Sequence, residues 1–282
     1  MSTPTETPDS AISNFYDTYG SAEWERLERT GYGRLQAIIH TDFLREYVEE
    51  GANVLDAGAG PGRFSIELGR LGARVTVQDI SAEQLRIAKQ KISDADQLDS
   101  IDGFLHGSIA DLSELPDSRF DVVVCFGGAL TYVRDERFKA VQELARVVKP
   151  GGIILASVMS RYGAAISMVN QGTSAIVSES FESAVRDGEL PPFTSCRTGQ
   201  LHPAMHLYSS EELRELFISV GDVLAIAGSN VTVREGNHVF EESLDSEPAW
   251  RRIVELERAA SRTPGLTDVG SHIIIATRKA NL

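Results

Sequence analysis

Apolar residues follow two spacings along most of this chain. Short apolar runs that predict strands lie at residues 53–56, 74–78, 103–106, 121–126 and 153–157. Between them, apolar positions recur at helical spacing over residues 63–71, 81–92 and 136–148. The run at 121–126 is uninterrupted, as expected for a strand that is buried on both faces. Strands that alternate with helices predict an α/β fold, with a mostly parallel sheet and helices on both faces.

The alternation stops after the fifth predicted strand. Residues 158–208 hold Gly, Ser, Pro and scattered charges without a sustained period, and we interpret them as an insertion that serves as a lid. Periodicity returns at Ser209, where Glu212 completes the spacing of a capping box. A sixth strand over 223–227, a helix over 247–260 and a last strand over 272–277 complete the pattern. The helix before the last strand favours an antiparallel arrangement of that strand.

The first fifty residues predict a tail followed by a helical cap. Residues 1–10 are polar and rich in Pro and Thr, and we expect them to be disordered. The aromatic stretch 11–29 predicts a helix with a break at Gly20, and a second helix follows up to Tyr47. The chain therefore divides into a tail and cap, residues 1–50, and one domain, residues 51–282, that contains the insertion 158–208.

The net charge of the chain limits the classes of molecule that it is expected to bind. The chain of 282 residues has 27 basic and 41 acidic side chains, a net charge of −14. Because nucleic-acid affinity depends on Lys and Arg at the phosphates, this balance argues against a nucleic-acid substrate. The start has no signal-peptide pattern, no apolar run is long enough for a membrane span, and the two cysteines form no CxxC motif. We expect a cytoplasmic enzyme, monomeric or homodimeric, without membrane partners.

The most informative segment follows the first predicted strand and reads Asp56-Ala57-Gly58-Ala59-Gly60-Pro61-Gly62-Arg63. A strand, a glycine turn and a helix N-terminus bring backbone N–H groups close to a ligand, as in all dinucleotide-binding folds. Arg63 stands where the dinucleotide fingerprint has its third glycine. Asp56 would repel a pyrophosphate and favour a ligand with an ammonium or sulfonium group. S-adenosylmethionine carries both cations, so the segment favours this cofactor over NAD.

This segment resembles the first motif of the class I S-adenosylmethionine-dependent methyltransferases, and the resemblance extends over residues 35 to 160. It implies a seven-stranded sheet of order 3-2-1-4-5-7-6, with S-adenosylhomocysteine as the product. Asp79, at the end of the second predicted strand, is expected to bind the ribose hydroxyls, and Ile80 the adenine face. Asp111 is expected near the exocyclic amine of the purine. The predicted cofactor-binding residues are Tyr16, Tyr32, Asp56, Ala57, Gly58, Gly60, Arg63, Asp79, Ile80, Ser108, Ile109, Ala110, Phe126 and Gly127.

Candidate catalytic residues are His206 and Tyr132. An oxygen acceptor would need a base, and His206 is the candidate for that role; Tyr208 is a second candidate substrate contact. His202 and His206 are four residues apart, but Pro203 disfavours one regular helix there, so we predict no metal site. We expect His272 to be structural.

The acceptor class follows by exclusion. The Asn/Asp-Pro-Pro-aromatic signature of methyltransferases that act on nucleobase amines is absent, since Phe126-Gly127-Gly128-Ala129 follows the fourth predicted strand. We therefore expect methyl transfer to an N or O atom of a small molecule bound between the cap, the insertion and residues 127–132. Three alternatives stay open: S-adenosylmethionine chemistry without methyl transfer, a non-catalytic regulator that binds this cofactor, and an NAD-dependent oxidoreductase.

Overall fold

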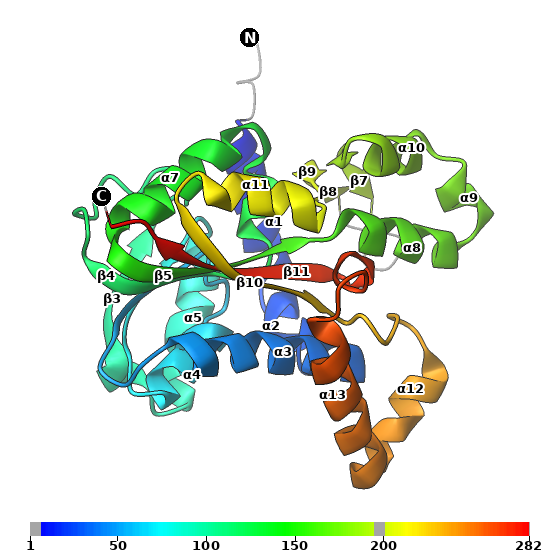
Figure 1. Ribbon diagram of the computed structural model, residues 1–282, viewed down its shortest axis with the longest axis horizontal. Coiled ribbons are helices and arrows are strands. Elements are labelled where there is room, and N and C mark those ends of the chain that lie inside the picture. Colours follow the sequence, from blue (N-terminus) through cyan, green and yellow to red (C-terminus); the bar gives the residue numbers. More distant parts are fainter. Residues whose placement is uncertain (1–6, 195–200, 282) are drawn as a thin grey trace.

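A seven-stranded sheet forms the centre of the molecule in the computed structural model, which describes residues 7–194 and 201–281 (Figure 1). Its strands are β1 (Asn53–Ala57), β2 (Arg74–Asp79), β3 (Ile101–His106), β4 (Phe120–Cys125), β5 (Val148–Met159), β10 (Gly221–Ser229) and β11 (His272–Lys279). Their order across the sheet is β10-β11-β5-β4-β1-β2-β3. Strand β11 runs antiparallel to both of its neighbours, whereas the other pairs are parallel. With β10 and β11 as the sixth and seventh strands, the predicted order 3-2-1-4-5-7-6 is confirmed.

Helices cover both faces of the sheet, as Figure 1 shows. The helices on one face are α3 (Gly31–Tyr47), α4 (Arg63–Arg70) and α5 (Ala82–Asp94); those on the other are α7 (Arg137–Val147) and α11 (Ser210–Ile218). Alternate residues of β1 serve the two layers, because Val54 packs with the first group of helices and Leu55 with the second. Each layer excludes water from one sheet face, which accounts for the apolar run of β4.

The cap is formed by α1 (Pro8–Tyr19) and α2 (Ala22–Arg26), separated at Gly20 as predicted. Asp17 Oδ1 accepts hydrogen bonds from Ser81 Oγ and from the N–H of Glu83 at the start of α5. Gln84 Nε2 donates to the carbonyls of Tyr16 and Gly20. These bonds hold the cap beside the carboxyl ends of β1 and β2. The predicted disorder is wrong for Pro8–Ser10, which begin a helix capped by the side chain of Thr7; residues 1–6 lie outside the described ranges.

The insertion contains more regular structure than its composition indicates. It holds α8 (Arg161–Gln171), α9 (Thr173–Ile176) and α10 (Glu179–Arg186), then two small antiparallel pairs, β6 (Glu189–Leu190) with β9 (Met205–His206) and β7 (Phe193–Thr194) with β8 (Leu201–His202). Ser160 and Ser178 cap α8 and α10 by accepting a backbone N–H. In the sequence, these two serine caps mark the starts of α8 and α10.

Shorter elements complete the chain. They are α6 (Ala129–Tyr132), α12 (His238–Glu242), α13 (Glu247–Ser261) and the 3₁₀ helices Leu98–Ser100, Arg134–Glu136, Ser243–Asp245 and Thr267–Val269. Helix α13 packs on α3 with two ion pairs, Arg258 to Asp42 and Arg262 to Glu46. Among the helices of the described ranges, none combines the length and the apolar character that a membrane span requires.

Gly33 sets the distance between α3 and the segment that follows α2. A Cβ at this position would lie 2.2 Å from the carbonyl oxygen of Arg26 and 2.9 Å from Cα of Leu27. Both neighbours are backbone atoms, which cannot rotate away. We expect Gly33→Ala to lower the free energy of unfolding by about 1–3 kcal/mol, the usual cost of overpacking. Urea denaturation measures this change. Gly103→Ala is the matched control, because no atom lies within 4 Å of its Cβ position; equal stability of the two variants would contradict the prediction.

Candidate active site

The glycine loop, residues 57–62, is fixed by hydrogen bonds to the neighbouring strand β2. The N–H of Gly58 donates to Gln78 Oε1 (3.0 Å), that of Ala59 to the carbonyl of Gln78 (2.9 Å), and that of Gly60 to Asp79 Oδ2 (2.7 Å). Gly58 and Gly60 have φ of +68° and +55°, which side chains with a Cβ rarely adopt. Three consecutive N–H groups that a pyrophosphate would need are therefore already bonded within the protein. This arrangement disfavours a dinucleotide and leaves the adjacent carboxylates to face a ligand.

A cavity with an empty volume of about 930 Å³, counted to its open mouth, lies over the glycine loop. Sequence-predicted residues that line it are Tyr16, Asp56, Gly58, Gly60, Arg63, Asp79, Ile80, Ser108, Ile109, Phe126, Gly127 and Tyr132. They come from the cap and from the ends of β1, β2, β3 and β4, so the fold brings most of the predicted set to one place.

Four predicted cofactor contacts do not line this cavity. Ala57 and Ala110 are buried in the hydrophobic core on the α7 side of the sheet. Tyr32 lies on α3, where its hydroxyl bonds to Ser271 and its ring packs near Val233. Asp111 is exposed, and its carboxylate accepts the N–H of Ser113, as in a turn. The resemblance to the class I methyltransferases implies that these residues contact the ligand, but in the structure they lie in the core, on α3 or at the surface.

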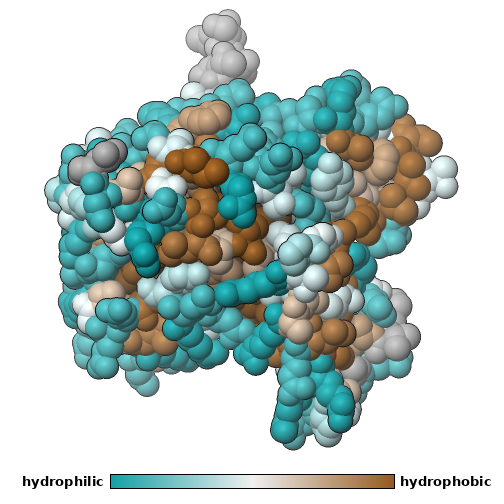
Figure 2. Space-filling model, viewed as in Figure 1, coloured by the Kyte–Doolittle hydropathy of each residue, from teal (hydrophilic) through white to brown (hydrophobic). Residues whose placement is uncertain are grey.

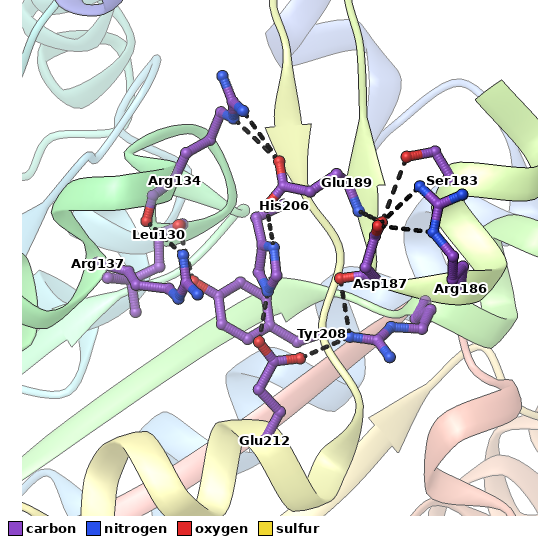
Figure 3. A network of polar contacts seen from close by, with 11 residues as sticks. Leu130, Arg134, Arg137, Ser183, Arg186, Asp187, Glu189, His206, Tyr208 and Glu212 are labelled. Atoms are coloured by element: carbon purple, nitrogen blue, oxygen red, sulfur yellow. Dashed lines mark hydrogen bonds and ion pairs between the residues drawn. The ribbon is translucent and has the colours of Figure 1, made fainter. Parts of the chain in front are cut away.

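His206 lies outside the cavity, between two carboxylates (Figure 3). Its Nδ1 is 2.7 Å from Glu189 Oε1, and its Nε2 is 2.5 Å from Glu212 Oε1. Arg134 pairs with Glu189 and Arg161 with Glu212, so the chain of charges joins the insertion to α11. Both ring nitrogens are engaged, which leaves none to take a proton from an acceptor. The arrangement thus argues against His206 as a base and for a role in holding the insertion.

Tyr208 and His202 also lie outside the cavity, and each is engaged by neighbouring groups of the protein. The Tyr208 hydroxyl donates to the carbonyl of Leu130 (3.2 Å), and its side chain is fully buried. The ring of His202 lies against Phe15 and Phe193. His202 and His206 therefore contact different groups. His272 is buried beside Gln36 and His40, as expected for a structural residue.

Cap residues that sequence reasoning missed contribute an ion pair to the cavity. Arg26 forks onto Glu23 through Nε (3.1–3.2 Å) and Nη2 (2.6 Å), and its Nη1 is 3.5 Å from Gln36 Oε1. All three line the cavity, as do Ile12, Leu27 and Phe64. Arg63 lies over the ring of Trp24 at 4.0 Å and pairs with Glu28 (2.9 Å), which fastens α2 to the start of α4. Helix α2 is short and carries charges of both signs, so its sequence alone does not indicate which charged side chains face the cavity.

The buried carboxylates hold protons more tightly than exposed ones. Burial raises the pKa of Asp56 to about 7; the hydrogen bond from Ser65 Oγ (2.6 Å) opposes this shift and the charge of Asp79 adds to it. Burial likewise raises the pKa of Asp79 to about 6, against the N–H groups of Ser81 and Gly60. A cationic ligand in the cavity would reverse these shifts, since it stabilises the ionised carboxylates.

Tyr16 and Tyr132 form a hydrogen-bonded pair between the cap and α6, with their rings edge to face at 5.6 Å. Burial raises the pKa of both hydroxyls. Near neutral pH both therefore stay protonated and act as hydrogen-bonding groups, and neither is prepared to act as a base.

Residues 54–152 match the protein family described as a methyltransferase domain. The malonyl-[acyl-carrier protein] O-methyltransferase of Pectobacterium atrosepticum is 34% identical over 128 residues, which cover 45% of this chain and 44% of that protein. The ubiquinone biosynthesis O-methyltransferase of Xanthomonas oryzae pv. oryzae is 33% identical over 127 residues, 45% of this chain and 51% of that protein. A tRNA 5-carboxymethoxyuridine methyltransferase of Escherichia coli is 31% identical over 138 residues, 46% and 52% of the two chains. The chain thus spans about half the length of these relatives.

Solved structures share the fold over nearly the whole chain. The cyclase SpnF superposes with a TM-score of 0.63 at 18% identity, covering 99% of this chain and 98% of its own. The 1,6-didemethyltoxoflavin-N1-methyltransferase of Burkholderia thailandensis, solved with S-adenosylhomocysteine bound, has a TM-score of 0.57 at 14% identity and covers 99% and 93%. At these identities the likeness concerns the fold, which is the class I, Rossmann-like architecture.

The raised pKa values make the stability of the ligand-free protein depend on pH. Between about pH 4 and pH 7, the folded chain keeps protons on Asp56 and Asp79 that the unfolded chain has lost, so these groups lower stability as pH rises. Asp56→Asn removes its share, so the stability of this variant relative to the native protein should rise by roughly 1.4 kcal/mol per pH unit between pH 5 and pH 7, and no further above pH 7. Urea denaturation at several pH values measures this; the exposed-site variant Asp135→Asn should show no such trend. A constant difference across this range would refute the assignment.

The position of His206 predicts a structural effect without a cofactor effect. His206→Ala leaves Glu189 and Glu212 facing each other without their shared partner, so we expect a loss of about 1–3 kcal/mol in the free energy of unfolding. The affinity for S-adenosylhomocysteine, measured by calorimetry, should not change. His206→Gln keeps one N–H donor, so its free energy of unfolding should lie between those of the native protein and His206→Ala. Weaker cofactor binding in a folded His206→Ala variant would instead return this residue to the site.

Proposed function

We propose that this chain, whose residues 54–152 match a methyltransferase domain, transfers a methyl group from S-adenosylmethionine to an N or O atom of a small-molecule acceptor. The supporting observation is the glycine loop, whose N–H groups at Gly58, Ala59 and Gly60 are bonded to β2 while Asp56 and Asp79 border the cavity. Such a site suits a cationic nucleoside better than a pyrophosphate.

The residues present fit this cofactor. The carboxylate of Asp79 keeps lone pairs for the ribose hydroxyls beyond the two N–H groups that it accepts. Ile80 and Ile109 offer apolar contact to adenine, and Asp56 offers a negative charge to an ammonium group. Arg26, which makes only a 3.5 Å contact through Nη1, suits the carboxylate of the methionine part. When bound, S-adenosylmethionine supplies a methyl group already activated by its sulfonium.

The chain's own contribution is then orientation and exclusion of water. The cap, through Tyr16, Glu23 and Arg26, lies over the cavity and limits solvent around the reacting atoms. Tyr132 presents a protonated hydroxyl at the same edge, where it can orient an acceptor by a hydrogen bond. No strong base among the predicted catalytic residues reaches the cavity, which favours acceptors that arrive as neutral amines or as oxyanions.

The acceptor stays a proposal, because named relatives act on different compounds. Two are O-methyltransferases and one is a tRNA methyltransferase. A net charge of −14 disfavours tRNA as the acceptor here. We propose that the insertion, residues 158–208, contributes to acceptor binding and serves as a lid. The cytoplasmic location and the monomeric or homodimeric state stay predictions.

Calorimetric titration with S-adenosylhomocysteine, S-adenosylmethionine and NADH tests the cofactor assignment. We expect micromolar binding of the first two and none of NADH. Asp56→Asn and Asp79→Ala should each weaken binding of S-adenosylhomocysteine by roughly 1.5–3 kcal/mol, the worth of a hydrogen bond to a charged group. Asp135→Asn is the control. Unchanged affinity in both variants, with circular dichroism of the native protein, would disprove the site; binding of NADH alone would disprove the function.

A further inference from the structure

Five side chains of alternating charge join the insertion to the rest of the domain (Figure 3). In order they are Arg134, Glu189, His206, Glu212 and Arg161, and the four contacts between them measure 3.0, 2.7, 2.5 and 2.8 Å. Glu189, His206 and Arg161 belong to the insertion, whereas Arg134 and Glu212 lie outside it. Three of these four contacts therefore connect the insertion to the domain, and we call the five residues the latch network.

The central ring of the latch network has a carboxylate at each nitrogen. Glu189 Oε1 lies 2.7 Å from Nδ1 of His206, and Glu212 Oε1 lies 2.5 Å from its Nε2. A neutral imidazole has one N–H group and one lone pair, so it can donate to only one of the two carboxylates. The other nitrogen would then turn its lone pair toward an ionised oxygen. Both contacts are favourable only when both ring nitrogens carry hydrogen.

The arrangement of charges favours the ring over the carboxylates as the carrier of this additional proton. Imidazolium keeps its proton to a pH about 2 units higher than a carboxylic acid does. Each carboxylate also has an arginine on its second oxygen, Arg134 for Glu189 and Arg161 for Glu212, which stabilises its ionised form. Burial opposes ionisation of Glu212, but the bond from His206 and the nearby positive charges hold its pKa below the usual value.

Other groups around the ring do not compete for its protons. The Tyr208 ring meets that of His206 edge to face at 4.7 Å, and burial raises the pKa of the Tyr208 hydroxyl, which is bonded to a backbone carbonyl. Arg137 of α7 adds positive charge beside the α11 carboxylate. The carboxylate of Asp187 is paired with Arg186 at 2.9 Å. Within the described ranges, the two glutamates are thus the acceptors that the ring protons meet.

We propose that the latch network is a proton-dependent latch: the doubly protonated ring of His206 holds β6 and β9 against α11, and loss of one ring proton to solvent loosens the insertion. The neutral ring keeps its bond to one glutamate, while the other contact becomes repulsive. Because the insertion also touches the cap through Phe15 and His202, loosening it removes one support of the cap. This inference concerns the attachment of the insertion and does not rest on the methyl transfer proposed above.

The protonation state of the ring is tested by ¹⁵N NMR of the imidazole nitrogens in the full chain at pH 6, with His206→Gln to assign the signals. We expect both nitrogens of His206 to carry hydrogen in the native protein. In Glu212→Gln the introduced amide can donate to Nε2 and still accept from Arg161, so a neutral ring satisfies every contact. We therefore expect one protonated and one unprotonated nitrogen in this variant. A neutral ring in the native protein at pH 6 would overturn the proposal.

The latch itself is tested by hydrogen exchange at pH 6 and pH 9, corrected for the intrinsic rate at each pH. The amides of Leu207 and Tyr208, which donate to the carbonyls of Gly188 and Met159, report on the insertion, and that of Leu55 in β1 is the internal reference. Relative to the reference, protection of the two reporter amides should fall at least fivefold from pH 6 to pH 9.

Two variants decide whether the latch network causes this loss of protection. Glu212→Gln and Glu189→Gln each let a neutral ring satisfy both neighbours, so the fall in protection should shrink to less than twofold. Glu215→Gln, at an exposed position of the same helix α11, is the matched control and should behave like the native protein. Protection that is independent of pH in the native protein, or a fall that is unchanged in both variants, would overturn the latch.

Discussion

The site depends on how the backbone N–H groups of the glycine loop are satisfied. A turn this tight, half-buried beside the cap, leaves consecutive N–H donors that cost free energy when they are unpaired. Here β2 supplies every acceptor for Gly58, Ala59 and Gly60, through the side chains of Gln78 and Asp79 and one carbonyl. The loop is therefore rigid before any ligand binds. Because these donors are bonded within the protein, the cavity over the loop is bordered by the carboxylates of Asp56 and Asp79 instead of by unpaired N–H groups.

The cap forms one wall of the cavity and is held to the domain by polar contacts from both α1 and α2. Asp17 and Gln84 join α1 to α5, and Arg63 joins α2 to α4 by stacking on Trp24 and pairing with Glu28. Each contact is directional, so the cap has one position over the loop and not a range of them. The Glu23–Arg26 pair is consequently held at the wall of the cavity.

Similarity to known proteins is concentrated where the cofactor would bind. The family match covers residues 54–152, and named relatives align over less than half of this chain. The cap and the insertion lie outside that match.

The sequence by itself determined the strands of the sheet and the segments that surround the cavity. The order of the strands came from the resemblance to the class I methyltransferases. Runs of apolar residues and glycine turns are local signals, and parallel strands bring their carboxyl ends to one edge, so Asp56, Asp79 and Phe126 were predicted together. Only the tertiary structure decided which way side chains point. Ala57 and Ala110 enter the core, His206 joins two distant carboxylates, and Arg26 faces inward. These outcomes depend on contacts between residues that are far apart in the sequence. A local sequence pattern contains no information about such long-range contacts.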